Sequence, residues 1–201
     1  FRRNSEFVET VIAEFARSAP RHHHLILKAH PLEDGRARNR HAIRDSAASH
    51  GLTERVHYLR GGKLADLMAH ARSIVTVNST AAQQALWRGI PVKALGCAVY
   101  QKTGITSDQT LADFFKAPRA PDPHAYRIFR DYLLQTSQVP GGFYSRRSRA
   151  HALRLVADMM LAPLDPYETL ADGHVTHRQQ ITDPVAWIPC SCGPGARQTL
   201  D

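Results

Sequence analysis

The chain has 201 residues and a formal net charge of +8, from 26 Lys and Arg against 18 Asp and Glu. This length, with 43% hydrophobic residues, is enough for one α/β domain with a core of its own. The excess of positive charge favours anionic partners such as nucleotides, nucleic acids or acidic lipid surfaces. Three cysteines, one isolated and two in a C-x-C, fit neither a disulfide framework nor paired CxxC zinc ligands, and no apolar run reaches the ~20 residues that cross a bilayer.

The first half of the chain alternates predicted helices and strands. Apolar residues in 5–18 repeat with helical spacing, with Ser5 as the predicted N-cap and Pro20 after the end. A short continuous apolar run at 25–27 suits a strand buried on both faces, and further strands are predicted at 56–59, 74–77 and 91–95. Helices are predicted between these strands, at 37–50, 64–71 and 81–88. This alternation predicts a doubly wound, Rossmann-like parallel sheet.

The pattern becomes helical after Gly104. Helices are predicted near 111–115 and over 122–136 and 147–161, and the periodicity fades beyond Pro163. We therefore divide the chain into a domain over residues 1–162, which includes the C-terminal helices, and a poorly ordered tail over 163–201.

A cationic pair follows the first predicted strand. Lys28 and His30 are two residues apart, so in extended backbone both side chains point to the same side. Pro31 fixes its own φ and favours an extended His30. Ligands of open α/β sheets bind beyond the carboxyl ends of the strands, where this pair lies, so we interpret it as an anion site. A surface lysine and a capping histidine before a turn are the alternative.

Three small polar residues, Asn78-Ser79-Thr80, link the third predicted strand to a helix. They suit a helix N-cap, and the backbone N–H groups of a helix N-terminus attract phosphate; capping without a ligand is the alternative. We expect this segment at the same sheet edge as the Lys28 pair. Gly62, in the Gly61-Gly62 pair after the second strand, either lets a ligand approach the backbone or forms a plain turn.

Taken in order, these motifs resemble one known family. The run Lys28 to Gly35 is similar to the K-x-H-P-L-(D/E)-x-G segment of bacterial capsule polysaccharide synthesis proteins of the KpsS/KpsC (LipB) type. Residues 75–80 and 85–96, then Tyr100 and 104–106, follow with the order and spacing of that family. The likeness extends over about residues 1–160.

The resemblance implies a β-Kdo transferase with CMP-Kdo as donor and no metal. It implies a GT-B fold of two Rossmann-like domains, with this chain as the C-terminal, nucleotide-sugar-binding half and the catalytic residue expected in an N-terminal domain that the chain lacks. Related CMP-sugar transferases hold the CMP phosphate with an H-P motif and a Ser/Thr motif. Carried over here, those are His30-Pro31, with Lys28 beside them, and Ser79-Thr80. Many members have N-S-T-x-G, whereas Ala81-Ala82 follows Thr80 here.

The resemblance also implies partners and a place in the cell. The acceptor would be lyso-phosphatidylglycerol or the growing poly-Kdo linker, within a capsule synthesis and export complex at the cytoplasmic side of the inner membrane, without nucleic acid. One alternative is a non-catalytic interaction module of that machinery, which predicts salt-dependent membrane association and no nucleotide binding. Another is a UDP-sugar transferase or epimerase, which would place a carboxylate on the ribose late in the fold; no candidate for it stands out in the sequence.

Overall fold

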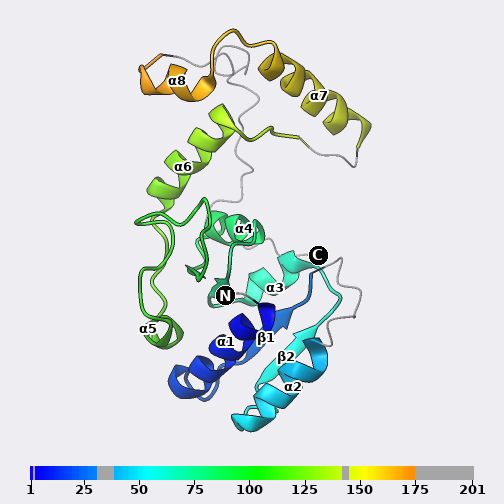
Figure 1. The fold of residues 1–201 in the computed structure, drawn as a ribbon, viewed down its shortest axis with the longest axis vertical. Coiled ribbons are helices and arrows are strands. Elements are labelled where there is room, and N and C mark those ends of the chain that lie inside the picture. The colour runs from blue at the N-terminus through cyan, green and yellow to red at the C-terminus, as the bar shows by residue number, and fades with distance from the viewer. Residues whose placement is uncertain (2, 31–38, 142–144, 175–201) are drawn as a thin grey trace, which may run out of the picture. The chain divides into compact units, whose positions relative to one another are not determined.

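The computed structural model describes residues 1, 3–30, 39–141 and 145–174. They form two compact units, Phe1–Tyr126 and the residues from Arg127 onward. Figure 1 shows the elements in chain order: α1 (Asn4–Ser18), β1 (Leu25–Lys28), α2 (Asn39–Ser49), β2 (Val56–Leu59), α3 (Leu64–His70), β3 (Ile74–Thr76), α4 (Ala81–Trp87), β4 (Val92–Ala94), α5 (Leu111–Lys116), α6 (Pro123–Thr136), α7 (Arg146–Met160) and α8 (Pro166–Ala171). The predicted alternation of strands and helices is confirmed.

The strands pair in parallel, as predicted, but in two sheets rather than one. β1 pairs with β2 in a register from Leu25↔Val56 to Lys28↔Leu59, and β3 pairs with β4 from Ile74↔Val92 to Thr76↔Ala94. Within the described residues, no ladder joins the two pairs. A strand of three or four residues offers few ladder bonds. Among the described residues, two strand pairs stand in place of the single continuous sheet expected from the sequence.

The core of the first unit joins segments that are far apart in the sequence. α1 buries Val11, Ile12 and Phe15 in a cluster that also contains Phe115 of α5 and residues of α2. The rings of Phe15 and Phe115 meet edge to face, with centroids 5.4 Å apart. Partly buried residues of both sheets, Leu25, Leu27, Tyr58 and Val75, pack against this cluster. The two strand pairs thus share one core.

Arg55 ties the start of the β1–β2 pair to the end of α1. Its guanidinium lies 5.0 Å from the centre of the Phe15 ring and donates hydrogen bonds to the carbonyls of Pro20 (2.7 Å) and His23 (3.0 Å). One cationic side chain therefore satisfies two carbonyls of the turn before β1 and covers an aromatic face of the core.

Two local predictions need correction. Ser5 lies inside α1; the N-cap is Arg3, which makes no side-chain cap bond, although its guanidinium lies 3.3 Å from the Glu6 carboxylate. Beyond Pro163, where no element was predicted, α8 begins after Asp165, whose carboxylate accepts from the backbone N–H of Tyr167 at 2.7 Å. Six residues show too little periodicity to predict such a helix. The rest of the predicted tail, 175–201, lies outside the described residues.

The second unit contains α6 after Tyr126, then α7 and α8. Leu133 of α6 and Leu155 of α7 are buried, and the rings of Tyr132 and Tyr167 join α6 to α8 with centroids 6.0 Å apart. In the part of the chain that the structure describes, none of the helices has the length and apolar character needed to cross a membrane.

Candidate functional site

The carboxyl edge of the β1–β2 sheet carries Lys28 and the Gly61-Gly62 turn. Lys28 ends β1, and its Nζ lies 3.2 Å from the carbonyl oxygen of Ala29 and 3.5 Å from that of Arg60, just after β2. Gly62 has a φ of +83° and open space around it, a conformation that favours glycine. Since an ammonium has three N–H donors and the longer contact is weak, Lys28 retains donor capacity toward a ligand at this edge.

His30 follows Lys28 by two residues and is exposed. Pro31, the other half of the H-P motif, lies outside the described residues. The structure therefore describes two of the three residues predicted to bind phosphate here, Lys28 and His30. The prediction that Pro31 stiffens the backbone after His30 stays a prediction.

A buried tyrosine fixes the segment between β3 and α4. Tyr100 is 1% exposed, and its hydroxyl donates to the carbonyl oxygen of Ser79 at 2.8 Å. Burial raises the pKa of Tyr100, so the phenol keeps the proton that it donates. The Ser79 backbone N–H in turn reaches Thr76 Oγ1 at 3.3 Å. Ser79 is thus held at both its amide and its carbonyl, by partners 3 and 21 residues away in the sequence.

The first backbone N–H groups of α4 have acceptors within the segment itself. The N–H of Ala81 reaches Ser79 Oγ at 3.3 Å, that of Ala82 the Ser79 carbonyl at 3.1 Å, and that of Gln83 the Thr80 carbonyl at 3.0 Å. Thr80 is the N-cap of α4 but makes no side-chain cap bond, and phosphate binding by this segment stays a prediction. Because Ser79 Oγ accepts from an amide, its own proton remains the donor for a ligand, together with the exposed side chains of Asn78 and Thr80.

Gly96 allows the ends of β3 and β4 to approach closely. Its N–H donates to the Val77 carbonyl at 3.0 Å, beyond the last pair of the ladder. A Cβ at this position would lie 2.6 Å from Val77 Cγ1 and 3.0 Å from the Val77 carbonyl oxygen. The absence of a side chain at Gly96 therefore sets the course of the chain into Asn78-Ser79-Thr80.

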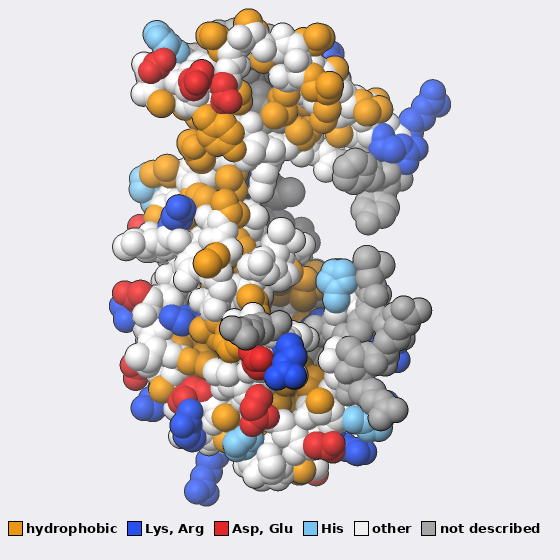
Figure 2. All heavy atoms as spheres, viewed as in Figure 1, with side chains coloured by type: hydrophobic (Ala, Val, Ile, Leu, Met, Phe, Trp, Pro, Cys, Tyr) orange, Lys and Arg blue, Asp and Glu red, His pale blue; other side chains and the backbone are white. Residues whose placement is uncertain are grey.

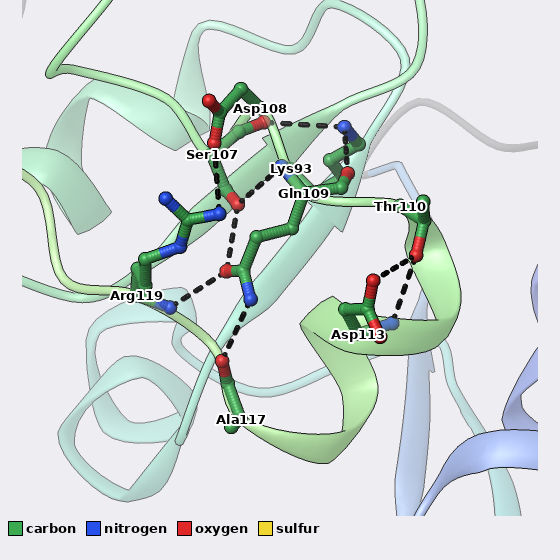
Figure 3. Close-up of polar contacts among 8 residues, drawn as sticks. All are labelled: Lys93, Ser107, Asp108, Gln109, Thr110, Asp113, Ala117 and Arg119. Carbon is green, nitrogen blue, oxygen red and sulfur yellow. Dashed lines mark hydrogen bonds and ion pairs between the residues drawn. The ribbon is translucent and has the colours of Figure 1, made fainter.

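The loop after β4 is anchored by Lys93, whose Nζ donates to the carbonyls of Ser107 and Gln109 (Figure 3). The Gln109 side chain accepts from the Arg119 backbone N–H at 2.9 Å and donates to the Ala117 carbonyl at 2.9 Å. Lys93 therefore holds loop carbonyls. In the sequence Lys93 is one position of the family-like segment 85–96, and periodicity gives no signal for these contacts.

The structure thus forms two local sets of predicted site residues. Lys28 lies near the Arg60 carbonyl, next to Gly61-Gly62 in the sequence, and Ser79 is held by Tyr100 beside Asn78 and Thr80. The meeting of these two sets, with His30, around one ligand stays a prediction. Among the described residues, no group of three or more His, Cys, Asp and Glu side chains is arranged to hold a metal ion.

Comparison with known proteins gives consistent matches. Residues 1–144 match the family described as "Capsule polysaccharide biosynthesis protein". The chain is 34% identical over 139 residues to the "Capsule polysaccharide export protein KpsS" of Escherichia coli, covering 69% of this chain and 36% of that protein. It is 36% identical over 141 residues to the "Capsule polysaccharide modification protein LipB" of Neisseria meningitidis, covering 70% of this chain and 34% of that one. The chain thus spans about a third of the length of these relatives. No solved structure matches it.

Proposed function

We propose that this chain, which belongs to the capsule polysaccharide biosynthesis protein family, binds CMP-Kdo and takes part in transferring Kdo to a lipid-linked acceptor. It would serve as the nucleotide-sugar-binding half of a GT-B glycosyltransferase, with lyso-phosphatidylglycerol or the growing poly-Kdo linker as acceptor. The observation that carries the proposal is the Lys28 ammonium at the carboxyl edge of a parallel strand pair, beside an open glycine turn. Ligands of α/β sheets bind at such edges.

The chemistry asks for positive charge and hydrogen-bond donors at the phosphate. CMP leaves as a phosphate monoester, so negative charge grows on its oxygens as the glycosidic bond breaks. Lys28 Nζ, the exposed His30 ring and the Ser79 O–H are the donors that the chain offers for that charge. Removing one well-placed donor of this kind slows the chemical step by about 100- to 1,000-fold in other enzymes.

The proposal is tested by nucleotide binding before turnover. CMP should raise the melting temperature of the protein and UDP should raise it less, because a ligand that binds only the folded state stabilises it by mass action. Lys28→Met should weaken CMP binding. Lys116→Met is the matched control, since Lys116 is an exposed lysine at the end of α5 with no assigned role.

Three results would count against the proposal. A folded protein that CMP does not stabilise would favour the non-catalytic interaction module. Stronger protection by UDP than by CMP would favour a UDP-sugar enzyme. Equal loss of CMP binding in the Lys28 and Lys116 variants would mean that overall charge, and not the strand end, attracts the nucleotide.

In protein active with CMP-Kdo, His30→Ala should lower turnover.

We also propose that the protein works at the cytoplasmic surface of the inner membrane, within the capsule synthesis and export machinery. This is supported by α7, whose apolar residues Leu153, Val156 and Met160 are exposed. Figure 2 shows hydrophobic side chains at the surface of the part of the molecule that contains α7. The same helix carries exposed Arg146 and Arg154, and a basic amphipathic helix suits an anionic lipid surface. Flotation with vesicles rich in phosphatidylglycerol should recover the protein at low salt, and less of the Leu153→Ser variant.

A further inference from the structure

We infer that the hydroxyl of Tyr126 is a positioning group for Ser79, and so for the nucleotide site on whose proposed function this inference rests. Tyr126 lies in the first half of α6 and is 4% exposed. Its hydroxyl donates to the carbonyl oxygen of Gln83 in α4 at 2.9 Å, although the two residues are 43 positions apart in the sequence. Burial of an aromatic ring explains the packing of Tyr126 but not the placement of its hydroxyl.

Two buried tyrosines hold the turn that contains Ser79. Tyr100 donates to the Ser79 carbonyl at 2.8 Å, and Tyr126 donates to the Gln83 carbonyl. Thr80, between these two carbonyls, has helical dihedral angles, with φ −62° and ψ −21°. Carbonyls four residues apart in helical backbone lie one above the other, so both hydroxyls act on the same side of this turn.

The bond from Tyr126 is additional to those that form the helix. A helix places one N–H on each carbonyl, whereas a carbonyl oxygen has two lone pairs. Gln83 donates its own N–H to the Thr80 carbonyl at 3.0 Å, and its carbonyl accepts from Tyr126. Tyr126 therefore restrains Gln83, which restrains Thr80, the residue that follows Ser79.

The start of α6 is itself anchored. The carboxylate of Asp122 accepts from two backbone N–H groups of the first turn of α6, at 2.8 and 3.3 Å. The Asp122 N–H donates to the Gly104 carbonyl at 2.7 Å. Gly104 lies four residues after Tyr100, so one loop joins the supports of both tyrosines, and Tyr126 can hold α4 from a fixed place.

Restraint of Ser79 before a ligand arrives favours binding. The hydroxyl of Ser79 is one of the donors proposed for the phosphate of CMP, and the Ser79 carbonyl is held by Tyr100. A group that is already ordered loses less freedom when it binds, so its contact contributes more to the affinity. Tyr126 would thus raise the affinity for CMP through Ser79.

The test measures CMP affinity by titration calorimetry on the full chain, as a double-mutant cycle. Tyr126→Phe keeps the buried ring and removes only the hydroxyl, so it should weaken CMP binding by roughly three- to tenfold, equivalent to about one hydrogen bond. In the Ser79→Ala background the same change should have no further effect, because the positioned hydroxyl is gone. Tyr132→Phe, in the same helix at a position 43% exposed, should leave the affinity unchanged.

The inference is overturned if Tyr126→Phe binds CMP as the wild type does, which is the result expected of a role in stability alone. It is also overturned if Tyr132→Phe loses as much affinity, or if Tyr126→Phe costs the same factor with and without Ser79→Ala. Hydrogen exchange without nucleotide gives a second measurement: exchange at the Gln83 N–H should be faster in Tyr126→Phe, and an unchanged rate would contradict the restraint.

Failure of the proposed function gives a different result. A wild-type protein that does not bind CMP would overturn the proposed function and this inference together, before any variant is compared. If the wild type binds CMP and Lys28→Met weakens the binding while Tyr126→Phe does not, the proposed function stands and only the role of Tyr126 is overturned.

Discussion

Replacing Gly96 by alanine tests how the protein positions the Asn78-Ser79-Thr80 segment. The new Cβ would meet Val77 at three atoms, 2.6 Å from Cγ1, 3.0 Å from the carbonyl oxygen and 3.3 Å from the carbonyl carbon. Rotation of the valine side chain can relieve the first contact only. The other two involve backbone, so the end of β3 must move away from β4.

The expected loss of stability follows from this geometry. Overpacking of this kind destabilises proteins by about 1–3 kcal/mol. Alanine also has less conformational freedom than glycine in the unfolded chain, and this stabilises the folded state by about 0.4–1 kcal/mol. We therefore expect Gly96→Ala to lower the free energy of unfolding by about 1–2 kcal/mol, which corresponds to a fall in melting temperature of roughly 2–8 °C for a chain of this size.

Urea unfolding of Gly96→Ala, with Gly61→Ala as the matched control, measures this loss. A Cβ at Gly61 has no atom within 4 Å, and its φ lies outside the range that favours glycine, so the control should keep or slightly gain stability. If Gly96→Ala were as stable as the wild type, the close approach of β3 and β4 would be refuted. CMP affinity should also fall in Gly96→Ala, because the displaced backbone leads directly into Ser79.

Tyr100, His23 and Gln109 allow three separate tests of local contacts. Tyr100→Phe removes the hydrogen bond to the Ser79 carbonyl and should lower the free energy of unfolding by about 0.5–1.5 kcal/mol, measured in urea. The pKa of His23 is lowered by burial first and then by neighbouring positive groups, so the unfolded chain binds the proton more readily. Stability should therefore decrease as the pH falls below about 6.5, and this decrease should be smaller in His23→Gln; an unchanged slope would contradict it. Gln109→Ala removes the side-chain oxygen that accepts from the Arg119 backbone N–H, so hydrogen exchange at that amide should become faster. Exchange at the wild-type rate would contradict the role of Gln109 in holding the loop.

The order and type of most elements could be predicted because each carries a periodic or continuous apolar pattern. Val11, Ile12 and Phe15 repeat at helical spacing and are buried, as the pattern indicates. The cap of α1 could not be predicted in the same way, because the helix begins at Asn4, one residue before Ser5, and its N-cap Arg3 makes no side-chain cap bond that a sequence pattern would mark. Which strands pair is not specified by the pattern either: β1 pairs with β2 and β3 with β4 among the described residues.

For the candidate site, the sequence indicated which strand ends carry polar residues but not what those residues contact. Lys28 and Ser79 were found because they follow apolar runs. The role of Tyr100 depends on a hydrogen bond across 21 residues. The contacts of Ser79 with the backbone N–H groups of Ala81 and Ala82 likewise have no signal in the sequence, and whether this segment also binds phosphate stays a prediction.

The edge-to-face contact of Phe15 with Phe115 has a consequence for synthesis on the ribosome. The first helix cannot complete its hydrophobic environment until the chain has grown by a further 100 residues. At about 5–20 residues per second, this leaves the apolar face of α1 without its final partner for roughly 5–20 seconds. During that interval the nascent chain is a natural client for a chaperone, and slowing translation before Phe115 should increase its aggregation.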